Sequence, residues 1–373
     1  MLPRHVNFLA NAASSASLIF IPLWAAQLGA SVEQIGFIFA AYNGSILVSS
    51  YVFGRAADVH GSRKILQAGL VLASVASFLQ VFAFDPATVT STRVFLGFSV
   101  GMYPAALLAY ARTSDRAIGP FAAWGSLGWA LGSFLAGFAD FLAPGDARPI
   151  FVLSSILFLA TFGLALSARP EAAGTFSVPL FPVALIKRNL PVYVAMLIRH
   201  TGANMIWVIF PLYMRDRLLM SGLEIGIAYA LNPVVQFVVM RQLDRFRSTT
   251  LVAIGLIGSA LTFLSFTAAQ NFPQMLLTQV LLGFSWATLY VGSLQFIVDR
   301  NPETATAGGI LGSVLSISSI LGPIIGGVLS AGGNYILPMY VAAGMCIAAL
   351  AAYWFELRTS ATQARAPATR SGD

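Results

Sequence analysis

The sequence predicts an all-α membrane protein in which twelve transmembrane helices form two related six-helix halves. Three observations lead to this prediction: the low charge content, the spacing of the apolar runs and an internal repeat. Hydrophobic residues make up 57% of the chain and charged residues only 9%, whereas a soluble domain carries roughly 25% charged residues. A surface so poor in charge must face lipid.

Twelve apolar runs divide the chain, and each is close to the roughly 20 residues that cross the hydrocarbon core of a bilayer. They leave only short connecting segments, so we expect no soluble catalytic domain and no enzyme activity. Proline and glycine occur inside several runs, which membrane helices tolerate because neighbouring helices satisfy the freed backbone groups. The predicted spans cover residues 7–28, 35–54, 65–84, 89–111, 121–142, 150–167, 190–213, 223–243, 249–269, 273–298, 306–330 and 335–356.

Arginine and lysine between the spans predict the orientation, because cytoplasmic loops carry an excess of these residues. With the N-terminus placed inside, only Arg148, Arg215 and Arg217 of the 21 Lys and Arg residues fall in outer segments. Arg93 and Arg199 fall within spans, and all the others lie in inner segments. The bias recurs at each inner loop. It predicts that both termini are cytoplasmic and that the protein resides in a plasma or inner membrane.

An internal repeat relates the two halves. The segment 92–99 in the fourth span matches 278–285 in the tenth, and 20–24 in the first span resembles 209–213 in the seventh. Further matches at nearly the same offset pair Ile35-Gly36 with Ile225-Gly226, Asn43 with Asn232, and Asp58 with Asp244. A parallel repeat predicts two bundles related by an axis along the membrane normal. The predicted organisation is an N-terminal six-helix bundle at 1–167, a cytoplasmic linker at 168–189, a C-terminal six-helix bundle at 190–358, and a disordered cytoplasmic tail at 359–373.

The segment between the second and third spans reads Gly54-Arg-Ala-Ala-Asp58-Val-His-Gly61-Ser-Arg63-Lys64. It resembles the loop 2–3 signature of the major facilitator superfamily, G-x-L-A-D-R-x-G-R-K, although valine and serine replace two of its basic residues. The resemblance covers essentially the whole chain and implies the fold of that superfamily, with a gating contact between the halves on the cytoplasmic side. The alternative is that these loop charges are merely solvated. The implied gating residues are Gly54, Asp58, Gly61, Arg63, Lys64, Arg93 and Arg112.

Three glycine-rich segments bear on the branch within the superfamily. Arg93, Gly97 and Gly101 in the fourth span match a second feature of the family. The segment 125–132 in the fifth span resembles the sugar and aromatic-acid permease branch. The segment 322–327 in the eleventh span resembles a motif that drug antiporters carry in their fifth span. We therefore expect a permease near the first branch, and a multidrug exporter of the same fold remains the alternative.

Arg199 and His200 are the polar residues at greatest predicted depth, about 15 Å from the inner end of the seventh span. An ionisable group at this depth requires a cavity or a partner. Arg199 is predicted to attract an anionic substrate group, and His200, on one stripe with Asn204, to bind substrate or exchange a proton. Alternatively, Arg199 bonds backbone carbonyls and His200 packs. The remaining candidate binding residues lie on spans that line the cavity in the resembled family: Asn11, Tyr103, Trp286 and Tyr290.

Several classes of chemistry lack a signal in the sequence. The single cysteine, Cys346, excludes a disulfide framework, and we expect no metal, cofactor or nucleic-acid partner. No Asp or Glu lies in the middle of a span, so carboxylate-based proton coupling is not favoured, and coupling through His200, another ion or uniport stay open. The predicted function is secondary active transport of a small organic solute by a monomer. The alternatives are a multidrug exporter and a transport-inactive membrane sensor or assembly protein.

Overall fold

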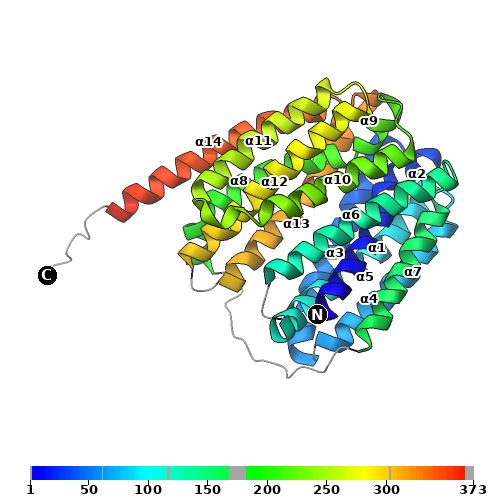
Figure 1. The fold of residues 1–373 in the computed structure, drawn as a ribbon, viewed down its shortest axis with the longest axis horizontal. Coiled ribbons are helices and arrows are strands. Elements are labelled where there is room, and N and C mark those ends of the chain that lie inside the picture. Colours follow the sequence, from blue (N-terminus) through cyan, green and yellow to red (C-terminus); the bar gives the residue numbers. More distant parts are fainter. Residues whose placement is uncertain (1, 61, 116–117, 168–181, 302–303, 366–373) are drawn as a thin grey trace.

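The computed structural model describes residues 2–60, 62–115, 118–167, 182–301 and 304–365, and among these residues it contains helices and no strands. The helices run roughly side by side (Figure 1). The elements are α1 (Leu2–Ile19), α2 (Ile21–Gln27), α3 (Val32–His60), α4 (Ser62–Leu79), η1 (Gln80–Phe82), α5 (Pro86–Asp115), α6 (Ile118–Leu142), α7 (Arg148–Ala165), α8 (Val183–Trp207), α9 (Phe210–Asp216), α10 (Gly222–Met240), η2 (Leu243–Arg245), α11 (Ser248–Ala268), α12 (Phe272–Arg300), α13 (Thr304–Leu329), η3 (Ala331–Gly333) and α14 (Leu337–Arg365).

The helices pack as two groups that follow the chain. In the group formed by α1–α7, α1 packs against α6 and α7, and α5 packs against α3 and α4. In the group formed by α8–α14, α8 packs against α13 and α14, and α12 packs against α10 and α11. The main contacts between the groups are α6 with α10 and α3 with α13, and α2 also meets α9. Below, the N-half denotes α1–α7 and the C-half denotes α8–α14.

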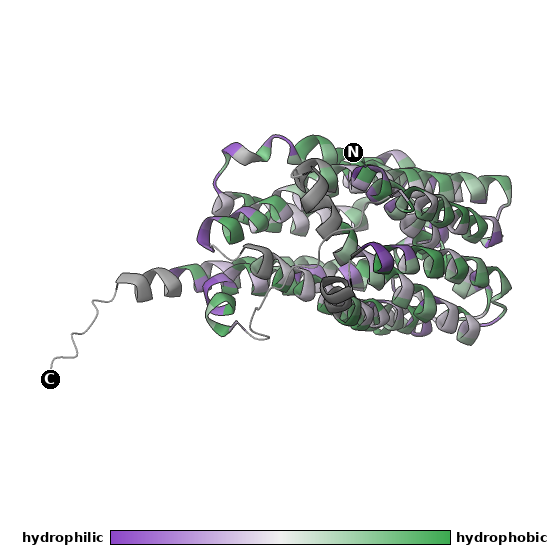
Figure 2. Ribbon diagram, turned by 90° about the horizontal axis from the view of Figure 1, so that it is seen from below, coloured by the Kyte–Doolittle hydropathy of each residue, from purple (hydrophilic) through white to green (hydrophobic). Residues whose placement is uncertain are grey.

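Long apolar surfaces run along the helices. Within the described part of the chain, nine helical segments are long and apolar enough to cross a membrane. Figure 2 shows apolar residues along the helices and hydrophilic residues mainly towards their ends. Large apolar side chains such as Phe37 (61% exposed) and Leu277 (72% exposed) stand on the exterior. Apolar exposure on this scale indicates an exterior that contacts lipid.

The first and seventh predicted spans are each interrupted at a proline. Helix α1 ends at Ile19 and α2 begins at Ile21, with Pro22 in its first turn. Helix α8 ends at Trp207 and α9 begins at Phe210, with Pro211 in its first turn. Proline lacks the backbone donor of a continuous helix and its ring clashes with the preceding turn. The two interruptions fall in the paired segments 20–24 and 209–213 of the internal repeat.

Three helices extend beyond the predicted spans. Helix α3 continues to His60, so Gly54 and Asp58 lie on its last turns instead of in a loop. Helix α8 begins at Val183, inside the segment predicted as a linker, and α14 continues to Arg365, into the segment predicted as a disordered tail. Apolar content predicts the part of a helix inside the bilayer, whereas the backbone hydrogen bonds continue into water until a breaker intervenes.

Only part of the predicted gating motif lies within the described residues. Gly61 lies outside the described residues, as do the side chains of Asp58 and Arg112; of Gly54 only the helical backbone is described. Arg63 is described, and its Nη2 donates to the carbonyl of Leu166 at 2.9 Å, which links the start of α4 to the end of α7. The side chain of Lys64 is exposed.

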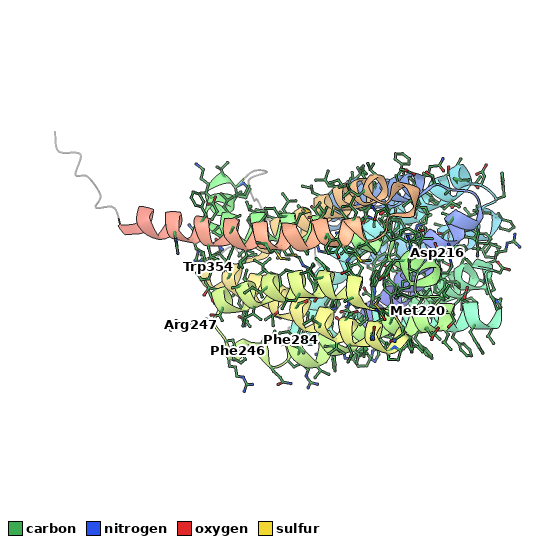
Figure 3. The ribbon with its side chains drawn as sticks, turned by 90° about the horizontal axis from the view of Figure 1, so that it is seen from above. Asp216, Met220, Phe246, Arg247, Phe284 and Trp354 are labelled. Atoms are coloured by element: carbon green, nitrogen blue, oxygen red, sulfur yellow. The ribbon has the colours of Figure 1, made fainter. Side chains whose placement is uncertain are left out.

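The hydrophobic core joins the halves at one end of the molecule only. One buried cluster combines Phe20 and Ile35 of the N-half with Phe210 and Ile225 of the C-half. The other buried clusters each belong to a single half. The end that contains α2 and α9 is therefore closed, and we call it the closed end. In Figure 3, Asp216 and Met220 lie towards the closed end, whereas Phe246, Arg247 and Trp354 lie towards the opposite end.

Glycines bring the backbones of the two halves together at the closed end. A Cβ on Gly36 of α3 would overlap the carbonyl of Pro323 on α13. A Cβ on Gly137 of α6 would lie 2.8 Å from the carbonyl oxygen of Gly222 and 2.8 Å from the Cα of Gly226 on α10. Small residues permit this close approach of membrane helices. The α3–α13 and α6–α10 contacts therefore form two glycine seams between the halves.

Candidate substrate-binding site

A ladder of stacked rings connects α8 with α12. The rings of His200 and Trp286 lie 5.3 Å apart between centroids at an interplanar angle of 27°. Trp286 stacks in turn on Tyr290, one helical turn further along α12, at 5.4 Å and 20°. We call these three residues the aromatic ladder. His200 is only partly buried, but its Nδ1 is buried and has no hydrogen-bond partner among the described residues.

Arg199 lies against Trp286, the middle ring of the same ladder. Its side chain is 1% exposed, and its Nε donates to Ser259 Oγ on α11 at 2.9 Å. The guanidinium carbon lies 4.9 Å from the ring centre of Trp286 and 5.3 Å from that of Phe263. Arg199 and His200 are neighbours that point in different directions around α8, yet both contact Trp286. The structure thus brings four of the predicted binding residues together: Arg199, His200, Trp286 and Tyr290.

The charge of Arg199 has no acidic counterpart among the described residues, since neither a salt bridge nor a hydrogen bond to a carboxylate forms there. Its Nη2 is buried without a partner. A buried cation in this state raises the electrostatic potential around it. At about 5 Å and an effective dielectric constant of about 20, a unit negative charge gains roughly 3 kcal/mol before desolvation is subtracted. The region around Trp286 therefore favours anionic or neutral groups over cations.

Polar residues of the N-half form a second group. Asn11 Nδ2 donates to the carbonyl and the Oδ1 of Asn7, at 2.8 and 2.9 Å, and Asn7 Nδ2 donates to the carbonyl of Phe121 at 2.8 Å. The hydroxyls of Tyr103 and Ser14 are 3.3 Å apart. These contacts tie α1 to α5 and α6. No described hydrogen bond or ring contact connects this group with the aromatic ladder, so a molecule that touches both must lie between the halves.

Asn204 is the remaining predicted binding residue. Its Nδ2 donates to the backbone carbonyl of His200 at 2.8 Å, one turn earlier on α8. The side chain is partly buried. A Cβ on Gly322 of α13 would lie in direct contact with Asn204, so α13 approaches α8 closely at this point. This bond attaches the Asn204 side chain to the backbone at His200, where the aromatic ladder begins. The side-chain Oδ1 of Asn204 remains able to accept a hydrogen bond.

Arg93 points into the interior of the N-half. It is 1% exposed, and its guanidinium carbon lies 4.0 Å from the ring centre of Tyr42. Its Nη1 donates to Gln80 Oε1 at 3.4 Å and to Ser17 Oγ at 3.5 Å. Arg93 lies in the outer part of the fourth predicted span, from which a long side chain can also reach the membrane surface. Polar groups from α1, α3 and η1 instead hold it inside the bundle.

Sequence reasoning missed the residues that hold the two buried arginines. Ser259 and Phe263 occupy one face of α11, and Ser17, Tyr42 and Gln80 come from three different elements. Serine, phenylalanine and tyrosine are ordinary in membrane helices, so no local signal distinguishes them. Asn7 had a signal, since it lies one helical turn before Asn11. No group of three or more His, Cys, Asp or Glu in the described ranges is placed to hold a metal ion.

A family model described as Major Facilitator Superfamily matches residues 6–189 and 192–372, nearly the whole chain. This chain belongs to the Major Facilitator Superfamily. The resemblance found in the segment 54–64 is thereby confirmed. Membership makes the protein a multi-pass membrane transporter and not an enzyme, with a small molecule as its substrate.

Known relatives within the superfamily include resistance proteins. The chain is 24% identical over 350 residues to the quinolone resistance protein NorA of Staphylococcus aureus strain COL, covering 88% of each chain. It is 25% identical over 389 residues to the multidrug resistance protein MdtG of Salmonella paratyphi A, covering 94% of this chain and 93% of that protein.

Solved structures share the fold at low sequence identity. The nucleoside transporter NupG superposes with a TM-score of 0.78 at 11% identity, covering 96% of this chain and 98% of that one. A bacterial homologue of the human lysosomal transporter Spinster, in an inward-facing and unoccupied conformation, superposes with a TM-score of 0.78 at 13% identity, covering 97% and 96%. At these identities the likeness concerns the fold alone.

Proposed function

We propose that this transporter moves small amphipathic molecules that carry a planar ring and a neutral or anionic polar group. The observation that carries the proposal is the aromatic ladder with Arg199 beneath it. The stacked faces of His200, Trp286 and Tyr290 offer a surface for a planar ring, and stacking is worth about 0.5–1.5 kcal/mol beyond area burial. The guanidinium 4.9 Å from the Trp286 ring centre disfavours a cationic ring.

Asn11 and Tyr103 supply polar contacts from the N-half in this proposal. Asn204 and His200 supply them from the C-half, with His200 as the group that exchanges a proton. The names of NorA and MdtG, which refer to quinolone and multidrug resistance, favour export as the direction. We thus place the chain with exporters of amphipathic compounds, in preference to the sugar and aromatic-acid permeases that the segment 125–132 resembles.

The proposed topology has twelve spans with both termini in the cytoplasm. The interrupted pairs α1–α2 and α8–α9 each count as one span, and α3, α5 and α6, at 29, 30 and 25 residues, complete the set. The halves correspond to the bundles 1–167 and 190–358. In this orientation the closed end is extracellular and the conformation is inward-facing.

Transport by alternating access then requires the halves to rock about a central site between them. The glycine seams α3–α13 and α6–α10 separate when the outer side opens. Contacts on the inner side, which we propose to include Asp58, Arg63 and Arg112, form at that stage. The absence of a carboxylate in the middle of any predicted span leaves His200 as the titratable group nearest to the proposed site.

Replacing Trp286 tests the proposed site. In proteoliposomes we expect uptake of naphthoate and competition by naphthylmethanol, with at least about 10-fold weaker competition by naphthylmethylammonium. Trp286→Ala should weaken the apparent affinity for naphthoate about 10-fold, which corresponds to 1.4 kcal/mol, and Trp286→Phe should lie between. Trp354→Ala is the matched control, because Trp354 is exposed on α14 and its described ring contact is with Tyr353 and not with a ladder residue.

Two outcomes contradict the proposal in different ways. Unchanged affinity in Trp286→Ala removes the aromatic ladder from the site while leaving transport intact. A lack of flux for all three compounds, in protein that retains its helical content, contradicts transport of this substrate class and favours a transport-inactive role.

A further inference from the structure

A small cavity lies at the closed end, between the two halves. Its volume is about 160 Å³. An engineered apolar cavity of about 150 Å³ admits benzene, so this space accommodates a molecule with a single ring. Residues of both halves line it, among them Trp24, Gln27 and Asp140 of the N-half and Arg215, Met220 and Ile225 of the C-half.

Asp140 carries the unbalanced charge of this cavity. Its Oδ1 accepts a hydrogen bond from the backbone N–H of Gly145 at 3.3 Å, and no described Lys or Arg side chain lies within ion-pair distance of it. Its carboxylate rests against Gly222, the first residue of α10, where a Cβ would overlap it. Asp140 therefore reaches from the N-half to the N-terminus of a C-half helix, whose dipole favours a negative charge.

The cation that lines the cavity is already neutralised. Arg215 Nε lies 2.6 Å from Asp216 Oδ1, and Asp216 Oδ2 accepts a hydrogen bond from the Tyr335 hydroxyl at 2.9 Å. Burial raises the pKa of Tyr335 to about 12, so this hydroxyl remains a donor at neutral pH. The Arg215–Asp216 pair adds no net charge, so Asp140 is the unpaired charge among the lining residues. The nearby guanidinium of Arg148, whose carbon lies 5.7 Å from the Trp24 ring centre, is 4.0 Å from the carboxylate of Asp146.

The cavity also holds a polar donor without a partner. Trp24 is 7% exposed, and its indole Nε1 is buried without a hydrogen-bond partner among the described residues. An indole N–H needs an acceptor such as water, and an ammonium group only donates, so Trp24 offers such a group the face of its ring and not its N–H. Beside it, Met220 and Ile225 are buried apolar residues that the C-half contributes to the wall.

We propose that this cavity is a binding site for a small organic ammonium compound with a single ring, distinct from the aromatic ladder. The ammonium group pairs with Asp140, and the ring packs between Trp24 of the N-half and Met220 with Ile225 of the C-half. Because the walls come from both halves, the ligand binds only while the closed end is closed. It therefore stabilises that conformation by its differential affinity. Binding at this site does not depend on the proposed function. A ligand that holds the closed end closed should also inhibit transport, and this second expectation rests on the proposed function.

Benzylammonium tests the site directly, using the full chain in lipid nanodiscs. Titration calorimetry should show saturable binding of benzylammonium, at least 10-fold weaker binding of its neutral analogue benzyl alcohol, and no binding of benzoate. Asp140→Asn should remove the advantage of benzylammonium over benzyl alcohol. Asp85→Asn is the matched control, because Asp85 of the same half accepts a hydrogen bond from the backbone N–H of Thr88 at 2.7 Å and does not line the cavity. Equal binding of benzylammonium and benzyl alcohol by the wild type overturns the proposal.

A second variant tests the contribution of both halves. Gly137→Trp, which separates α6 from α10, should reduce benzylammonium binding at least 10-fold even though Asp140 is retained. Gly44→Trp should bind normally, because nothing lies within 4 Å of a Cβ at Gly44. Undiminished binding by Gly137→Trp overturns the bridging site.

A transport assay links the site to function. Benzylammonium should inhibit naphthoate transport by the wild type and should not inhibit naphthoate transport by Asp140→Asn. Saturable binding without any naphthoate flux would refute the proposed function and leave this site standing.

Discussion

Gly36→Trp is expected to abolish transport and to open the closed end. Even a Cβ at Gly36 would overlap the carbonyl of Pro323 and lie 3.2 Å from the Cα of Gly327, both on α13. These are backbone atoms, which cannot rotate away as a flexible side chain can. An indole at this position excludes the conformation in which α3 and α13 touch. A change of about 5.5 kcal/mol moves a two-state population from 1:99 to 99:1, and displacing a helix seam in a packed interface is of that order.

The measurement is the accessibility of a cysteine at the closed end. In a Cys346→Ala background, Ile225→Cys is buried at the interface of the halves, where Ile225 is 1% exposed. Adding Gly36→Trp should increase its labelling by a membrane-impermeant maleimide at least about 10-fold and reduce naphthoate transport at least about 100-fold. The same labelling rate with and without Gly36→Trp would show that the seam does not hold this end closed.

Gly44→Trp supplies the control on the same helix. No atom lies within 4 Å of a Cβ at Gly44, so a side chain can leave the backbone there without the overlap with α13 that it meets at Gly36. Transport and labelling should remain within about twofold of the parent protein. This pair of variants separates the loss of one conformation from general damage to α3, because both carry the same indole on the same element.

Arg199→Met is expected to remove the preference for anionic substrates without unfolding the protein. The methionine retains an apolar side chain between Phe263 and Trp286 and removes a buried cation whose Nη2 has no partner. Replacing a buried charge by an apolar residue of similar volume is often neutral or stabilising. We expect the ratio of the apparent affinities for naphthoate and naphthylmethylammonium to fall at least about 10-fold, and the midpoint of thermal unfolding to stay the same or rise.

Arg93→Met is the matched variant in the other half. Arg93 is equally buried, but it contacts Tyr42, Ser17 and Gln80 and none of the ladder residues. Its replacement should leave the preference between naphthoate and naphthylmethylammonium within about twofold, whatever happens to the rate of transport. Equal loss of the preference in both variants would mean that the net positive charge of the protein, and not the position of Arg199, selects the substrate.

Much of the site lay beyond reach of the sequence because side-chain direction depends on neighbouring helices. Adjacent positions on a helix differ by about 100°, so the sequence did not require Arg199 and His200 to face one site. The structure shows that Trp286 from α12 contacts both. Likewise, a helical wheel cannot reveal that Arg93 turns inwards, since Tyr42, Ser17 and Gln80 converge on it from three other elements.

The local properties of the chain follow from the sequence by itself. Sparse charge and apolar runs determine the membrane helices, and the segment 54–64 identified the superfamily. The structure adds that the first and seventh are interrupted next to Pro22 and Pro211, whereas Pro104 and Pro323 lie inside continuous helices. Only the tertiary structure shows that Gly36 and Gly137 face the opposite half and that one end is closed. Hydrogen bonds and hydropathy act within a helix, whereas the contact between the halves depends on their relative placement. The same sequence must allow more than one such placement if it is to transport.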